Sequence, residues 1–280
     1  MGRYSDHQKS NYLRRGLRDS AIRSFCGIKV DDKLNIPVIA EGPYEGVPAF
    51  ADYKSYFMEY FNDFLKYHDY DATNEWTLSQ ENSNLTGAVT ISDDLAYGYA
   101  TLAVTDATDN YGLSLQFTAV NGAGAFVLPA ANKVTVFETR IQIADATQCD
   151  FFAGLSISDT DIAAAAGAFI DATDFVGFEK DDGDAYIDFS AAKNSSETKN
   201  SAIVTMSNST WTTLAFRADG VTSLTPWYKD SNGIWKRGAP ITTSGSINDD
   251  EPMCITFGIC NGEAAAKSLL VDYVRVLLQR

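Results

Sequence analysis

The sequence predicts an all-β protein: an antiparallel two-sheet jelly-roll sandwich that carries an extended, partly helical N-terminal arm. Two observations predict the sandwich. From Glu75 onward, apolar and polar residues alternate in short runs, as in antiparallel strands with one buried face. Turn-forming clusters of Asp, Asn and Gly separate these runs, and the long helical segments of a parallel βαβ fold are missing from the pattern. A third observation, the basic charge of the first 29 residues, predicts the arm.

The N-terminal segment differs in charge from the rest of the chain. Residues 1–29 hold seven Lys and Arg against two acidic residues, a net of +5, whereas the remainder holds 15 basic and 35 acidic residues, a net of −20. Between Ser10 and Phe25, Leu13, Leu17 and Ala21 follow helical spacing. A solvated basic helix and a docking arm both fit this pattern. We favour docking, in which the arm pairs with acidic groups on a neighbour through Arg14, Arg15, Arg18 and Arg23.

Residues 30–49 contain three prolines and two glycines, which predicts an extended linker without regular structure. We therefore divide the chain into an arm with its linker, residues 1–50, and a jelly-roll domain, residues 51–280. The stretch from Ala49 to Tyr70 is densely aromatic. Its spacing fits an amphipathic helix and its composition also favours a strand, so both remain open.

The predicted strands are recognised by apolar residues at every second position. These residues are Leu113, Leu115, Phe117 and Ala119; Phe137, Ile141 and Ile143; Phe151, Ala153, Leu155 and Ile157; Leu214, Phe216 and Ala218; and Met253, Ile255, Phe257 and Ile259. Turns are expected between them, including those at residues 181–184 and 231–233. Asp-Ala-Thr occurs four times, at uneven spacings, and is interpreted as a recurrent turn opening rather than a structural repeat.

The stretch Ser268–Val276 is rich in β-branched and aromatic residues and stands close to the end of the sequence. A strand this apolar is unsuited to an exposed edge, because an unpaired hydrophobic edge promotes aggregation. We therefore expect it to close a sheet whose other strands come earlier in the chain.

Composition excludes several function classes. The net charge of −15 opposes nucleic-acid binding, and no apolar run approaches the 18 residues of a membrane span, so neither nucleic acid nor membrane is an expected partner. No signal-peptide pattern occurs in the first 29 residues, and the four scattered cysteines are expected to be free thiols of a protein made in the cytoplasm.

The two histidines offer neither a zinc cluster nor a Ser-His-Asp triad, and no phosphate-binding glycine motif is present, so no cofactor is predicted. Asp181, Asp182 and Asp184 are interpreted as a solvated acidic turn rather than a calcium site, and no metal is predicted.

Several short motifs, taken in order, resemble those of concanavalin A-like (laminin G-like) jelly rolls. They are Asp63-Phe64, Trp76-Thr77-Leu78, residues 137–141 (FETRI), 152–156 (FAGLS), 176–178 (VGF), 181–184 (DDGD), 211–220 (WTTLAFRADG) and 271–276 (VDYVRV). The composition looks closest to the versions that tailed bacteriophages carry as virion structural proteins. The resemblance covers about residues 55–280 and speaks to fold more than to function.

Glycoside hydrolases of this fold carry their acid and nucleophile on one strand as E-x-D-x-x-E, and this sequence has no such string. Glu138 is isolated, and Glu179 precedes an acidic turn. Because retaining hydrolysis needs two carboxylates about 5–5.5 Å apart, the sequence predicts a protein that is not an enzyme.

Two functional hypotheses follow. The resemblance implies a virion structural protein, most consistent with a capsid decoration component that residues 1–50 dock onto capsid or other virion proteins; the oligomeric state is left open. The alternative is a carbohydrate-binding module of a phage tail or surface protein that binds host glycans. Its stacking residues would be Trp227, Tyr228 and Trp235, for which packing in the core or an interface is the competing explanation.

Overall fold

The structure, a computed structural model, describes residues 28–30, 37–39, 42–45, 57–64, 76–80, 87–92, 98–117, 124–128, 133–159, 170 and 172–280. The chain forms two compact units, one made of Met1–Met58 with Gln279–Arg280 and the other of Glu59–Leu278. The helical stretch predicted at Ser10–Phe25, the four arm arginines and the predicted boundary at residue 50 all lie outside the described residues.

In the first unit, β1 (Ile28–Val30) and β2 (Pro37–Ile39) form a two-stranded antiparallel sheet, with Val30 opposite Pro37. The linker predicted to lack regular structure therefore contains a strand. Pro37 is compatible with that strand because it is the first residue, where a missing backbone N–H removes no interior ladder hydrogen bond.

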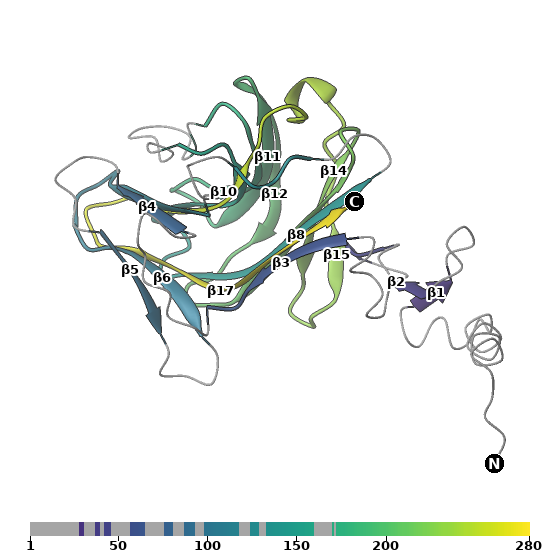
Figure 1. Ribbon diagram of the computed structural model, residues 1–280. Coiled ribbons are helices and arrows are strands. Elements are labelled where there is room, and N and C mark those ends of the chain that lie inside the picture. The colour runs from purple at the N-terminus through teal and green to yellow at the C-terminus, as the bar shows by residue number, and fades with distance from the viewer. Residues whose placement is uncertain are drawn as a thin grey trace, which may run out of the picture. The chain divides into compact units, whose positions relative to one another are not determined.

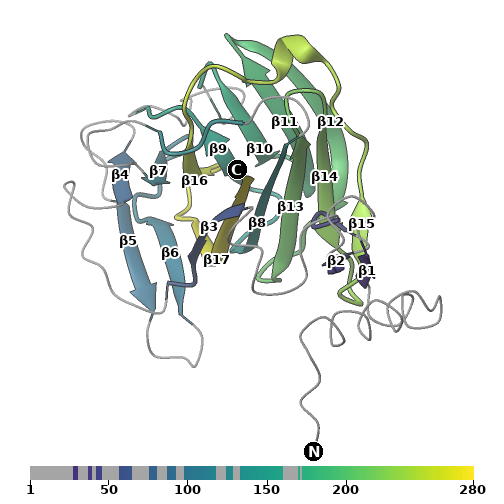
Figure 2. The same ribbon diagram turned by 45° about the vertical axis from the view of Figure 1, so that its right-hand side comes forward.

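The second unit is a sandwich of two antiparallel sheets, as predicted (Figures 1 and 2). One sheet has seven strands in the order β12-β11-β10-β9-β16-β7-β4. Its strands are β4 (Trp76–Gln80), β7 (Gly112–Phe117), β9 (Cys149–Ser156), β10 (Phe175–Lys180), β11 (Tyr186–Lys193), β12 (Ser196–Thr205) and β16 (Cys254–Asn261).

The other sheet has eight strands, in the order β15-β14-β13-β8-β17-β6-β5, with β3 pairing with β17 outside this path. Its strands are β3 (Phe57–Asn62), β5 (Gly87–Ser92), β6 (Tyr99–Val104), β8 (Val134–Ile143), β13 (Thr212–Asp219), β14 (Leu224–Lys229), β15 (Trp235–Arg237) and β17 (Ser268–Gln279). A short 3-10 helix, η2 (Ser244–Ser246), precedes β16. The aromatic segment for which helix and strand were both open is a strand at β3.

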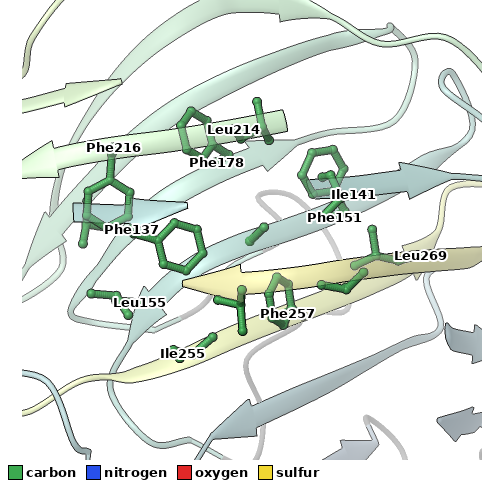
Figure 3. Close-up of a cluster of buried hydrophobic side chains, with 14 of the residues drawn as sticks. Phe137, Ile141, Phe151, Leu155, Phe178, Leu214, Phe216, Ile255, Phe257 and Leu269 are labelled. Atoms are coloured by element: carbon green, nitrogen blue, oxygen red, sulfur yellow. The ribbon is translucent and has the colours of Figure 1, made fainter. Parts of the chain in front are cut away.

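The core lies between the two sheets and consists of the apolar residues that alternate along the strands. Figure 3 shows side chains from both sheets directed into this shared layer. The eight-stranded sheet contributes Phe137, Ile141, Leu214, Phe216 and Leu269, and the seven-stranded sheet contributes Phe151, Leu155, Phe178, Ile255 and Phe257. All ten side chains are fully buried, which confirms the alternation read from the sequence.

β17 is an interior strand, as predicted for Ser268–Val276 (Figure 1). It pairs with β6 at one flank, where Leu269 is opposite Leu102, and with β8 at the other, where Val276 is opposite Phe137. Its register with β8 shifts between Val271 and Tyr273. The strand therefore joins the β15-β14-β13-β8 half of the sheet to the β6-β5 half.

Aspartate side chains and glycines stabilise several of the turns that connect the strands. In two of the Asp-Ala-Thr segments, the Asp carboxylate accepts the backbone N–H of the Thr: Asp106 from Thr108 and Asp145 from Thr147, each at 3.0 Å. The repeated tripeptide is thus a repeated side-chain-capped turn. Gly183 and Gly233 have φ values of 90° and 75° in the predicted turns, a region that favours glycine.

The seven-stranded sheet departs from the half-buried strands that the sequence predicted. Every residue of β9 and of β16 is buried. On the face away from the main core, Phe152, Phe175 and Cys260 join a second apolar cluster with Ile170 and Ala172. This cluster covers part of the outer face, which also holds buried polar side chains such as Ser156 and Thr256. Cys149, Cys254 and Cys260 are buried and form no disulfide with one another, and Cys26 lies outside the described residues.

Candidate functional site

Strand pairing sorts the three predicted stacking residues onto two faces. β14 and β15 form a hairpin with Trp227 opposite Arg237 and Lys229 opposite Trp235 (Figures 1 and 2). Because side chains alternate along a strand and directly opposed residues share a face, these four residues lie on one side of the hairpin. We call this set, Trp227, Lys229, Trp235 and Arg237, the hairpin face.

Tyr228 points the other way. It is opposite Leu214 on β13, a core residue, and it packs against the main hydrophobic core. Trp227 is opposite Ala215, which in turn is opposite Glu138 on β8. The structure therefore brings Trp227 and Trp235 together on the outer surface of the eight-stranded sheet and separates Tyr228 from them.

Each tryptophan of the hairpin face is flanked by a cation from the neighbouring strand. Lys229 Nζ lies 4.8 Å from the ring centroid of Trp235, and Arg237 Cζ lies 6.0 Å from that of Trp227. At these distances the negative ring face attracts the cation. Both indoles are partly exposed, while the Trp227 Nε1 atom is buried and donates to no acceptor in the described part of the chain.

The turn that joins the two strands is held by one carboxylate. Asp230 Oδ1 accepts the backbone N–H groups of Asn232 and Ile234, both at 2.9 Å, and Asp230 Oδ2 lies 3.4 Å from Lys236 Nζ. These N–H donors and Lys236 lower the pKa of Asp230. These contacts hold the turn that joins β14 and β15, the two strands that carry the tryptophans.

A second polar group lies on the outer face of the seven-stranded sheet. Glu179 on β10 is buried, and its Oε1 atom lies 2.6 Å from Lys199 Nζ on β12. Asp181 lies 3.6 Å from the same ammonium, and Asp188 and Glu197 each lie 4.0 Å from it. Burial raises the pKa of Glu179 to about 7 despite this lysine. Burial also lowers the pKa of Lys199, but the hydrogen bond and charge of Glu179 outweigh it and leave the pKa above its ordinary value.

Asp150 on β9 is a further buried carboxyl group of this face. Burial and the charge of Asp182 raise the pKa of Asp150 to about 7. Among the residues that the structure describes, no group of three or more His, Cys, Asp or Glu side chains is arranged to hold a metal ion, the turn at residues 181–184 included.

The two glutamates that the sequence singled out do not form a pair. Glu138 faces outward from β8 in one sheet, and Glu179 faces outward from β10 in the other. Stacked sheets lie about 10 Å apart, so side chains on the two outer faces are farther apart than the roughly 5–9.5 Å of glycosidase carboxyl pairs. Glu138 Oε1 accepts the phenol O–H of Tyr273 at 2.5 Å instead. Burial and the charge of Glu138 raise the pKa of Tyr273.

Sequence reasoning did not single out Trp211. Its ring lies 5.0 Å from Arg140 Cζ, and Arg140 also donates to Asp272 at 3.0 Å. Trp211 thus repeats the tryptophan–cation arrangement of the hairpin face at another place. The alternation of Arg140 with Phe137 and Ile141 was the available signal, because it places Arg140 on the outer surface.

Comparison with solved structures identifies the fold. A protein of unknown function from Shewanella oneidensis MR-1 superposes with a TM-score of 0.53 at 14% identity, over 80% of this chain and 87% of that one. Peanut lectin superposes with a TM-score of 0.51 at 11% identity, over 80% and 97%. A glycoside hydrolase family protein from Mycobacterium thermorestibile superposes with a TM-score of 0.51 at 13% identity, over 78% of this chain and 99% of that one. The sandwich is therefore a concanavalin-like jelly roll.

No protein-family model and no curated protein sequence matches the chain. In the described part of the chain, none of the helices has the length and hydropathy of a membrane span.

Proposed function

We propose that this chain is a non-enzymatic glycan-binding module and that the hairpin face is its binding surface. The observation that carries the proposal is the placement of Trp227 and Trp235 on one outer face of a rigid two-stranded hairpin. Trp227 and Trp235 occupy diagonal positions of the two paired strands. Diagonal residues lie about 7–8 Å apart, so both indoles can contact one short oligosaccharide. The fold is compatible with this role, since a lectin shares it.

The geometry modifies the predicted site. Tyr228, which packs against the core, positions the hairpin rather than stacking on a sugar.

A glycan array followed by calorimetry on the best ligand tests the proposal. Replacement of Trp227 or Trp235 by Ala should weaken binding about 30-fold, the equivalent of about 2 kcal/mol for a central aromatic contact. Trp211→Ala is the matched control, because it removes a partly exposed tryptophan beside an arginine elsewhere in the same unit. Equal losses for all three variants, or no glycan bound by the intact chain, would overturn the proposal.

A second function rests on the charge contrast along the chain. The +5 segment at residues 1–29 precedes a remainder of −20, which supports an arm that docks onto an acidic neighbour such as a capsid subunit. On this proposal the protein is a virion component, displayed as a capsid decoration.

Deletion of residues 1–29 tests the docking role. The shortened chain should still fold, which circular dichroism reports, and should be lost from purified particles, which mass spectrometry reports as copy number. Full occupancy of the particle by the shortened chain would defeat the docking proposal and leave the glycan-binding proposal intact.

A further inference from the structure

The hairpin face carries positive charge on a strongly acidic protein. The chain has a net charge of −15, yet the charged residues among these four positions, Lys229 and Arg237, are both basic. The acidic residue nearest in sequence, Asp230, is engaged with the turn backbone and with Lys236.

Among the described residues, no carboxylate pairs with either cation. Lys229 and Arg237 contact the two tryptophan rings instead. Elsewhere in the sandwich, the basic side chains Arg140, Lys199 and Arg275 each lie within 3.0 Å of a carboxylate oxygen. A basic group held over an aromatic ring without a counter-ion remains available to an anionic ligand.

The distances between the cations and the rings place the expected charge contact next to the expected stacking contact. Each cation sits 4.8–6.0 Å from the centre of a ring on which a sugar would stack. A carboxylate, sulfate or phosphate substituent on the stacked sugar or on its neighbour therefore comes within reach of the ammonium or guanidinium group. A neutral sugar would stack on the same ring and offer neither cation an anionic group.

We infer that the hairpin face selects anionic glycans, with Trp227 and Trp235 stacking on the sugar rings and Lys229 and Arg237 binding the acidic substituents. The inference rests on the proposed glycan-binding function and specifies its ligand class. Single-stranded nucleic acid, which also combines stacking bases with phosphates, is less favoured because the net charge of −15 repels a polyanion that extends beyond the four residues.

The test uses the full chain and ligand pairs that differ only in charge. Binding to oligogalacturonate is compared with binding to its methyl ester, and binding to dextran sulfate with binding to dextran, while a glycerol-phosphate polymer tests phosphate as the source of charge. The charged member of each pair should bind at least about tenfold more tightly, since one hydrogen bond to a charged group is worth about that factor. This preference should shrink as salt rises from 0.05 to 0.5 M, because added ions screen exposed charges.

Two glutamine variants locate the charge effect. Lys229→Gln and Arg237→Gln should each reduce affinity for the charged ligand about tenfold more than they reduce affinity for the neutral partner. Lys236→Gln is the control, because it removes the same charge from the same hairpin, but Lys236 is paired with Tyr228 and lies on the other side.

The outcomes separate the two proposals. Equal affinity for the charged and neutral members of both pairs overturns the anionic class while glycan binding stands. Failure of every glycan to bind overturns the proposed function itself. Binding of a dT oligonucleotide at least as tight as that of oligogalacturonate, with the same sensitivity to the two variants, overturns the ligand class in favour of nucleic acid.

Discussion

Glu179 Oε1 and Lys199 Nζ lie 2.6 Å apart, in a pair whose members differ in exposure: the glutamate side chain is 1% exposed and the lysine 26%. The lysine thus sits between a buried carboxyl group and solvent. Removal of the lysine would leave the glutamate buried without a partner, which costs more than the pair itself contributes.

We therefore expect Lys199→Met to lower the free energy of unfolding by about 2–3 kcal/mol at pH 8, below the full cost of breaking a buried pair because the lysine is partly exposed. Urea denaturation measures the change. Glu179→Gln in the Lys199→Met background should recover most of the loss, since no buried charge then remains. Lys236→Met, which removes a partner of an exposed pair with Asp230, should change stability by about 0.5 kcal/mol or less. A similar loss in both lysine variants would contradict the burial argument.

Stability should fall as pH rises from about 4 to 7. The pKa values of Glu179 and Asp150 are raised from 4.5 and 3.8 to about 7. Between those values the folded chain holds protons that the unfolded chain has released, so the stabilisation is complete below the unfolded pKa and is lost through pH 7.

The size of this effect is about 3 to 4 kcal/mol at most for Glu179, at about 1.36 kcal/mol for each unit of pKa shift. Urea midpoints at pH 4.5, 6 and 8 follow it. Glu179→Gln and Asp150→Asn should each flatten the decline. An unchanged slope in both variants would show that other groups set the pH dependence.

The contribution of Asp145 to stability changes with pH in the opposite direction. The backbone N–H of Thr147 and the ammonium of Lys267, 3.0 Å away, lower the pKa of Asp145 from 3.8 to about 2, against the raising effect of burial. The stabilisation is therefore present above pH 3.8 and is lost as pH falls through 2. Asp145→Asn should cost about 1 kcal/mol at pH 7, because solvent screens this largely exposed carboxylate, and clearly less at pH 2, as judged from thermal unfolding at the two pH values. A loss that is equal at both would indicate a packing effect instead.

Gly177 is expected to tolerate no side chain. A Cβ atom there would lie 2.7 Å from the Phe152 ring and 2.8 Å from the Ala153 carbonyl oxygen. Gly177→Ala should destabilise the protein by about 2–3 kcal/mol, the usual cost of overpacking a dense region. Gly245→Ala is the matched control, because a Cβ there meets no atom within 4 Å. A neutral Gly177 variant would mean that β9 and β10 can separate to make room.

Much of the sandwich could be predicted because its information is local. The alternation of Phe137, Ile141 and Ile143 with polar residues follows from the two-residue period of a strand and needs no knowledge of its neighbours. The interior position of Ser268–Val276 was predictable from its apolar composition alone, because the alternative was an exposed hydrophobic edge.

The arrangement of the candidate site was predictable only in part. Trp227 and Tyr228 are consecutive, so they can share a face only in a loop; once β14 is known to include both, strand alternation separates them. The start of that strand within a segment containing Pro226 is not evident from the sequence. Lys229 and Arg237 carried no signal, since their meeting with the tryptophans depends on the register of β15.

The burial of Glu179 was not predictable. Its alternation with Phe178 correctly places it on the outer face of β10, where a charged residue is normally solvated. Its burial depends on the cover over that face, where Phe152 and Phe175 pack with Ile170 and Ala172, and on β12, which supplies Lys199. Such coverage depends on residues distant in sequence.

The interior position of β17 bears on how the protein is synthesised. Its partner β8 ends at Ile143, so a nascent chain has made most of its strands before residues 268–279 leave the ribosome. Until then β8 and β6 present two unpaired backbone edges, the kind of surface that attracts other chains. Folding of the eight-stranded sheet is therefore completed after translation of β17, and a chaperone that shields those two edges would act during that interval.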